Sequence, residues 1–228
     1  MTVEPDLGSL YRLAREQVAE LVRSLSPQQL ETPIPVTPGW SVHGVVSHLA
    51  GVATDAVNGR LRGMPPPEQT AAQIAERART PTSIVLREWE RSGSQLEALL
   101  AKTREVTFSP VTDAAVHEQD IRGAVGVPGN RQGPLVDLAL GVAADLWMSR
   151  IESAGLPSAG AGEQSGPSIV GPDDAPVRFL GSRFELFRAI YGRRSRSQIE
   201  RRFVGTDDPS PYVSLMCVFE PPDHDVIE

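Results

Sequence analysis

Apolar residues recur at intervals of three and four along most of the first 153 residues, and this spacing most constrains the fold. Side chains three or four positions apart lie on one face of a helix. The pattern predicts helices over residues 7–25, 41–62, 70–79, 81–102, 111–126 and 135–153. We therefore expect a mainly α fold, in which four of the long helices form an antiparallel bundle and the last one packs alongside.

The rest of the chain has a different pattern. Residues 155–172 are rich in Gly, Ser, Ala and Pro, which is typical of a linker. Beyond it, strands are expected over 177–180 and 212–219, on either side of a long arginine-rich helix over 183–203. A short extended segment is also expected at 106–108. The expected organisation is a helical bundle, a linker and a small α/β segment, over residues 1–154, 155–172 and 173–228.

Composition limits the class of protein. The 228 residues carry a net charge of −7, which disfavours a dedicated nucleic-acid binder. No apolar run approaches the length of a membrane span, and the N-terminus is acidic where a signal peptide needs basic residues. The single cysteine, Cys217, excludes an intramolecular disulfide and is expected in the core. We therefore expect a cytoplasmic monomer or homodimer without nucleic-acid or membrane partners.

Histidines on two separate predicted helices are the most informative polar residues. On a helical wheel of about 100° per residue, His48 lies within about 60° of both Val45 and Val52 and so faces the interior. His43 falls about 140° from His48 on the same wheel and is expected in solvent. The two histidines of this helix therefore have different predicted roles.

The second inward histidine has a carboxylate one helical turn before it. Asp113 and His117 are four residues apart, at the spacing where two side chains can hold one ion, and Ile121 shares their face. Two imidazoles and a carboxylate that meet between helices form a facial metal site. We therefore predict that His48, Asp113 and His117 bind a divalent metal. The alternative is a core histidine whose ring is satisfied by a carboxylate of the bundle.

Neighbouring polar residues are candidates for supporting roles. Asp120 lies at the edge of the same face, where it could act in catalysis by orienting His117 or could pair with an arginine. Glu118 and Arg122 are expected to point away from the site. Trp40, shortly before the second long helix, is expected to anchor the helix start in the core rather than to bind substrate.

Three segments of the chain resemble the mycothiol-dependent maleylpyruvate isomerase family, within the DinB-like metalloproteins. They are Pro38-Gly39-Trp40-Ser41-Val42 with His48-Leu49, the run from His117 to Gly126, and the run from Phe184 to Arg196. The resemblance implies a DinB-like four-helix bundle with a divalent metal, usually zinc. The ligands are a histidine of the second helix and an acid-xxx-His pair of a later helix. The matching residues are His48, Asp113 and His117, with Asp113 where the isomerases themselves use Glu.

The resemblance also implies a chemistry. A zinc ion with three protein ligands keeps an open position, where a low-molecular-weight thiol is deprotonated and can attack a small electrophile. In the family the thiol is mycothiol, and the reactions include cis–trans isomerisation and thiol transfer. A non-catalytic protein that binds a small ligand or a partner on the same scaffold is the alternative.

Arginines of the C-terminal segment are candidates for binding the substrate. Eight of them lie between Arg178 and Arg202, and a guanidinium can bind a carboxylate through two parallel hydrogen bonds. Related isomerases use a C-terminal arginine in this way. Arg193 is therefore a candidate catalytic residue, and Arg193 and Arg194 are candidates for binding the thiol cosubstrate. The alternative is a solvated helix face whose arginines pair with nearby glutamates.

Overall fold

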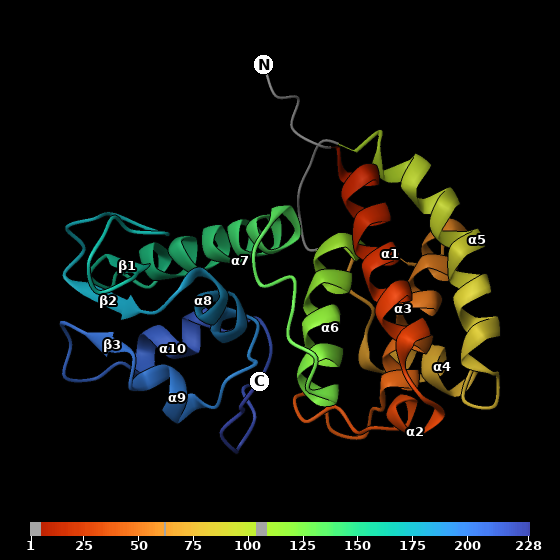
Figure 1. The fold of residues 1–228 in the computed structure, drawn as a ribbon. Helices are drawn as coiled ribbons and strands as arrows, with labels where there is room; N and C mark the ends of the chain where they lie inside the picture. Colours follow the sequence, from red (N-terminus) through yellow and green to blue (C-terminus); the bar gives the residue numbers. More distant parts are fainter. Residues whose placement is uncertain (1–5, 62, 104–108) are drawn as a thin grey trace. The chain divides into compact units, whose positions relative to one another are not determined.

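The computed structural model describes residues 6–61, 63–103 and 109–228, which form two compact units (Figure 1). One unit comprises Met1–Gly129 together with Glu228, and the other comprises Asn130–Ile227. The extended segment expected at 106–108 lies outside the described residues. Among the described helices, none combines the length and the apolar character needed to cross a bilayer.

The described part of the first unit is a bundle of four long helices with two short ones. The helices are α1 (Leu7–Ser24), α2 (Pro27–Leu30), α3 (Val42–Val57), α4 (Pro67–Ala75), α5 (Thr82–Leu100) and α6 (Pro110–Val125). Both α1 and α3 pack against α5 and α6, so the four long helices surround a common core. The short helix α4 packs against α3. The mainly helical fold expected from the apolar spacing is confirmed.

Buried apolar side chains of all four long helices form the core of this bundle. Val18 of α1, Val45 of α3, Trp89 of α5 and Val111 of α6 are all inaccessible to solvent. Burying a side chain of this kind contributes about 1.5–3 kcal/mol relative to leaving it exposed. The need to bury these faces fixes the rotation of α3 and α6, the helices that carry the inward histidines.

Local signals determine where α3 and α6 begin and end. The hydroxyl of Ser41 accepts a hydrogen bond from the backbone N–H of Gly44 at 3.2 Å and so caps α3. Pro110 is the first residue of α6, after Ser109 at the cap position. The same helix ends at Gly126, whose φ of 68° is the left-handed conformation that favours glycine.

The second unit combines four helices with a three-stranded sheet. Its elements are α7 (Pro134–Ser153), β1 (Ala159–Gly162), β2 (Val177–Leu180), α8 (Arg183–Ile190), α9 (Arg196–Glu200), β3 (Phe203–Val204) and α10 (Ser210–Met216). β2 is the central strand, parallel to β1 and antiparallel to β3. Its Phe179 packs edge-on against Phe203 of β3, which also contacts Trp147 of α7.

The division of the chain differs from the expected one. α7 was expected to pack alongside the bundle, but it packs against α8 and α10 and belongs to the second unit. The segment 155–172, expected as a linker, contains β1, in which Ala159 and Ala161 are buried. Small residues that look like a linker in the sequence here allow a strand to pair closely with β2.

Two further expectations for the second unit are wrong. The long helix over 183–203 is interrupted after α8, because Gly192 takes a left-handed φ of 67° and Ser195 caps the new helix α9. The strand expected over 212–219 is instead mostly α10, which buries Tyr212, Val213 and Met216 at helical spacing. Short apolar runs fit both a strand and a buried helix, and tertiary packing decides between them.

Candidate metal centre

His48 of α3 and Asp113 and His117 of α6 lie together inside the bundle. The Nε2 atom of His48 is 3.2 Å from Oδ2 of Asp113, and Nε2 of His117 is 3.5 Å from Oδ1 of Asp113. The three side chains offer one ligand atom each within 4.8 Å of one another. Since zinc–nitrogen and zinc–oxygen bonds are about 2.0–2.2 Å long, atoms at such separations can share one ion after small side-chain adjustments.

The other nitrogen of each ring is held by a hydrogen-bond acceptor. Nδ1 of His48 lies 2.9 Å from Oε1 of Gln73, and Nδ1 of His117 lies 3.0 Å from Oδ2 of Asp120. Histidines that bind a metal almost always donate their second N–H to a carboxylate or a carbonyl oxygen in this way. With both Nδ1 atoms engaged, the two Nε2 atoms face Asp113, so the donor set fits a divalent ion.

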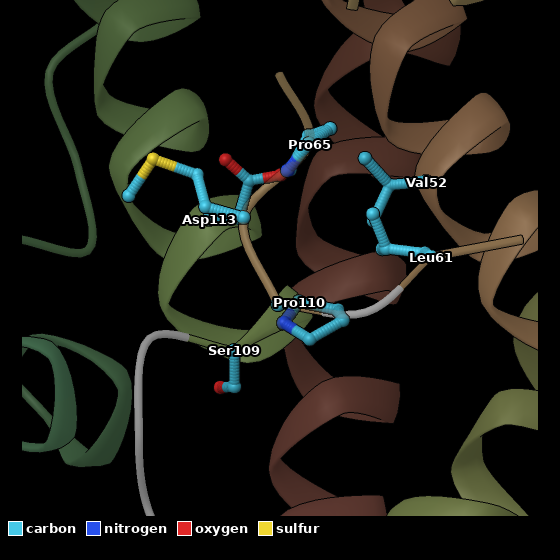
Figure 2. A pocket seen from close by; sticks show the side chains of 8 residues that line it. Val52, Leu61, Pro65, Ser109, Pro110 and Asp113 are labelled. Carbon is cyan, nitrogen blue, oxygen red and sulfur yellow. The ribbon is translucent and has the colours of Figure 1, made fainter. Parts of the chain in front are cut away.

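The side chain of Asp113 connects the cluster to a small pocket (Figure 2). Val52, Leu61, Pro65 and Pro110 form part of the apolar wall around it. The Asp113 side chain is 14% exposed, whereas those of the two histidines are 4% and 7% exposed. Asp113 is therefore the member of the cluster that lies nearest to solvent, and its mainly apolar surroundings strengthen electrostatic interactions.

The indole of Trp40 packs against both imidazoles. Its centroid lies 5.6 Å from that of His117, with the rings nearly parallel at 25°, and 5.1 Å from that of His48. The backbone of Trp40 is fixed by a 2.9 Å hydrogen bond from the N–H of Ile34 to its carbonyl oxygen. Trp40 is only half-buried. It therefore covers the two imidazoles of the cluster, a contact that the sequence expectation did not include.

One expectation about a neighbouring polar residue is wrong. His43 is 9% exposed rather than in solvent, with Nδ1 2.9 Å from Oγ1 of Thr82 and Nε2 3.1 Å from the carbonyl oxygen of Arg77. The helical wheel assigned one buried face to α3, but α4 and the start of α5 cover another. Glu118, expected to point away from the site, is buried and accepts a 2.8 Å hydrogen bond from Arg122.

Replacing His43 by alanine is expected to destabilise the protein by about 1–3 kcal/mol without lowering its affinity for zinc. The substitution removes the polar contacts of a buried ring with Thr82, Arg77 and Ser47, but none of the three candidate ligands. Urea unfolding and a zinc-chelator competition would measure the two effects. Thr82→Val, which removes only one of these contacts, should have a smaller effect on stability. Wild-type stability of the His43 variant would contradict the structural role.

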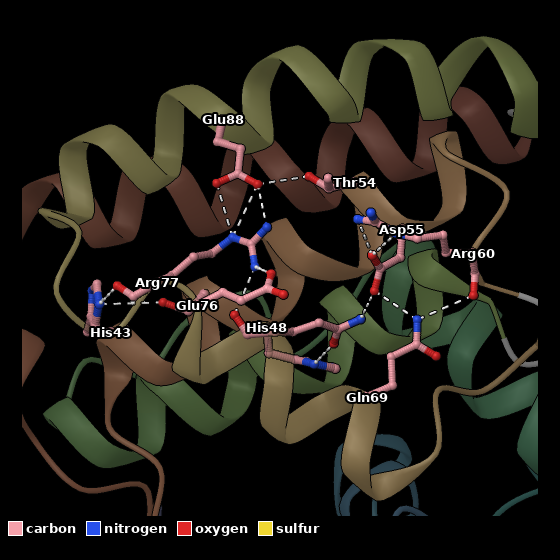
Figure 3. A network of polar contacts seen from close by, with 11 residues as sticks. His43, His48, Thr54, Asp55, Arg60, Gln69, Glu76, Arg77 and Glu88 are labelled. Atoms are coloured by element: carbon pink, nitrogen blue, oxygen red, sulfur yellow. Dashed lines mark hydrogen bonds and ion pairs between the residues drawn. The ribbon is translucent and has the colours of Figure 1, made fainter.

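A polar network that joins His48 and Asp55 through Gln73 was not predicted from the sequence. Figure 3 shows this network, with His48, Asp55 and Gln69 labelled. Gln73 lies on α4, the short helix that packs on α3, and it donates a 2.7 Å hydrogen bond to Asp55. Asp55 also accepts hydrogen bonds from Arg60 and Gln69. None of these residues lies at a spacing that marks a site in the sequence. The contacts form only when α4 folds back onto α3.

In the second unit, Arg193 and Arg194 are both buried. Nη1 of Arg193 donates to the carbonyl oxygen of Tyr191 at 2.9 Å, and its guanidinium lies 5.1 Å from the ring centroid of Phe219. Nη2 of Arg194 donates to Glu185 at 2.9 Å. These contacts hold the turn between α8 and α9. The two arginines are thus buried and not solvated, while the pairing with a nearby glutamate expected as the alternative is present for Arg194.

The fold and the site define a class of protein, a four-helix bundle in which two histidines and an aspartate form a candidate metal centre. Residues 11–122 match a family model described as the mycothiol maleylpyruvate isomerase N-terminal domain. These residues, which include His48, Asp113 and His117, therefore form an N-terminal domain of the mycothiol maleylpyruvate isomerase family.

Two solved structures are similar to the chain. One is the crystal structure of the mycothiol-dependent maleylpyruvate isomerase, with a TM-score of 0.52 and 16% identity over 82% of this chain and 88% of that chain. The other is a histidine-to-alanine mutant of that isomerase, with a TM-score of 0.53 and 15% identity over the same shares. At such identities the likeness shows a common fold. No curated protein is significantly similar to the chain.

Proposed function

We propose that this protein is a metal-dependent enzyme that activates mycothiol for the isomerisation of a small electrophile or for thiol transfer to it. The observation that carries the proposal is the orientation of the two imidazoles, whose Nε2 atoms both face Asp113 while their Nδ1 atoms are held. Membership of the family supports mycothiol as the thiol. The solved isomerase with the same fold supports a small unsaturated acid as the substrate.

His48, Asp113 and His117 would hold the ion, and two imidazoles with one carboxylate suit zinc. A bound divalent ion with an open position would lower the pKa of a thiol that enters it. Asp120 accepts a hydrogen bond from the ring of His117, which orients that ring and makes it a better ligand. A small molecule would approach this point from the side of Asp113, the most exposed of the three candidate ligands.

The attacking thiol in this proposal comes from the cosubstrate and not from the chain. Burial raises the pKa of the Cys217 thiol, the only one in the sequence, to about 11. A thiol with that pKa is almost wholly protonated near neutral pH and is a poor nucleophile. Cys217 also belongs to the second unit, where its sulfur lies 3.7 Å from the carbonyl oxygen of Ala189.

In this proposal the C-terminal arginines bind the negatively charged groups of the substrate and of the thiol cosubstrate. Arg193 and Arg194 lie in the segment that resembles the tail of the family, at the turn between α8 and α9. Hydrogen bonds between a guanidinium and a carboxylate are among the stronger ones in proteins, because both groups are charged. Arg193 would bind the substrate carboxylate, and both arginines would contribute to binding mycothiol.

The test combines metal content with turnover. The purified protein should contain one zinc ion per chain, and it should isomerise maleylpyruvate with mycothiol but not with cysteine at the same concentration. Elemental analysis and an absorbance assay of the substrate would measure the two properties. A protein that binds no metal and shows no turnover, yet binds small apolar molecules, would contradict the proposal and favour the non-catalytic alternative.

A further inference from the structure

Gln73 connects the candidate ligand His48 to a carboxylate that lies outside the cluster. The two ends of this connection, His48 and Asp55, are labelled in Figure 3. Its Oε1 atom is 2.9 Å from Nδ1 of His48, and its Nε2 atom donates to Oδ2 of Asp55 at 2.7 Å. Gln73 is 2% exposed, and all three side chains are buried. A buried chain of polar groups therefore runs from Asp55 through the amide to the imidazole.

Asp55 determines the orientation of the side-chain amide of Gln73. An ionised carboxylate can only accept hydrogen bonds, and Asp55 already accepts them from Arg60 and Gln69. Burial raises the pKa of Asp55, but hydrogen bonds from two glutamines and one arginine outweigh this effect, so the pKa lies below its ordinary value. The amide must present its NH₂ group to Asp55, because the reverse orientation would place two acceptor oxygens in contact. The carbonyl oxygen of Gln73 must then face His48.

This orientation determines which nitrogen of His48 carries the proton. A carbonyl oxygen is only an acceptor, so Nδ1 of the ring must be the donor in the 2.9 Å contact. In a neutral imidazole, a proton on Nδ1 leaves the lone pair on Nε2. Nε2 is the atom that faces Asp113. When an ion lies between Nε2 and Asp113 in place of any proton there, the ring already has the tautomer that a ligand needs.

A glycine of α3 makes this contact possible. A Cβ atom at Gly51, one turn after His48, would lie 2.6 Å from Cβ and 2.5 Å from Cγ of Gln73. Real Cβ atoms essentially never make contacts that short. The backbone of Gln73 is held in turn, because its carbonyl oxygen accepts a 2.9 Å hydrogen bond from Arg77. The close approach of α4 to α3 therefore requires a residue without a Cβ atom at position 51.

We propose that Gln73, fixed by Asp55, is a positioning residue that holds the proton of His48 on Nδ1 and so prepares Nε2 to bind the metal. The inference rests on the metal site of the proposed function and extends it to residues of α3 and α4 that do not bind the ion. Gln73 is not one of the three candidate ligands. Its effect is on which ring nitrogen of His48 carries the proton.

The test measures the position of the proton and the affinity for zinc in matched variants. Gln73→Met keeps the length of the side chain but removes the acceptor, so zinc should bind about 10–100-fold more weakly. In the metal-free variant, ¹⁵N spectra of the imidazoles at mildly alkaline pH should show a loss of the Nδ1–H form of His48. Gln69→Met is the control, because Gln69 also donates to Asp55 but does not contact His48. It should leave both properties unchanged.

A rescue variant separates positioning from packing. In Gln73→Glu with Asp55→Asn, the donor and the acceptor of their contact are exchanged, while the residue facing His48 remains an acceptor. This double variant should recover most of the zinc affinity that Gln73→Met loses. A metal-free wild-type protein whose His48 carries no proton on Nδ1, or a Gln73→Met variant with wild-type zinc affinity, would overturn the inference. Neither measurement uses a thiol or substrate, so a lack of turnover alone would contradict only the proposed function.

Discussion

Replacement of His117 by alanine is expected to abolish stable zinc binding and, with it, any turnover that depends on mycothiol. The substitution removes one of three candidate ligands, and a site left with His48 and Asp113 offers only two donor side chains. Loss of a residue that merely orients a ligand weakens metal binding by about 10–100-fold, so loss of the ligand itself should exceed that range. Zinc content after dialysis against a weak chelator, and the isomerisation rate, would measure the two losses.

A matched control comes from a histidine in the other unit. His224 is exposed and its ring contacts Asp223, far in the sequence from the cluster. His224→Ala should therefore keep wild-type zinc content and turnover. Circular dichroism would show whether the His117 variant retains its helices. If the folded His117 and His224 variants bind equal amounts of zinc, the candidate metal centre and the enzyme proposal are both contradicted.

The bundle could be predicted from the sequence because its signals are local. The apolar spacing of α1, α3, α5 and α6 repeats over several turns, and short capping sequences mark where helices start. The second unit has shorter elements, and there the same reasoning failed at α10 and β1. A run such as 212–219 is apolar enough for a strand or a helix, and only its packing against α7 and α9 decides.

The candidate ligands could be predicted for a similar reason. Asp113 and His117 are one turn apart, and the face of each helix follows from its apolar neighbours. Gln73 could not be predicted, because its contact with His48 depends on how α4 folds back onto α3. His43 was misplaced for the same reason, since a wheel cannot show that a second layer of structure covers the outer face of α3.

The largest effect on stability is expected at Glu97, which ties α1 to α5 inside the bundle. Its carboxylate accepts hydrogen bonds of 2.8 Å from both Arg12 and Arg15. Glu97 is 6% exposed and Arg15 is 8% exposed, so the central pair is buried. Gly93 makes room for it, because a Cβ atom there would lie 2.6 Å from Cδ of Arg15. Glu97→Leu should destabilise the protein by about 3–5 kcal/mol, because it leaves a buried guanidinium without its main partner.

Urea unfolding of three variants would show whether this cost comes from the unpaired charge or from the lost side chain. Glu90→Leu, at an exposed position of the same helix, should change the free energy of unfolding by no more than about 0.5 kcal/mol. The double variant Arg15→Met with Glu97→Leu should recover much of the loss, since apolar residues of similar volume often replace a buried ion pair at little cost. Equal destabilisation of the Glu97 variant and the double variant would contradict the unpaired-charge explanation.

Neither Arg15 nor Glu97 is a candidate ligand, so the folded fraction of each variant should still bind zinc. We therefore expect substitution of Glu97 to lower the free energy of unfolding without removing zinc binding, and substitution of His117 to remove zinc binding.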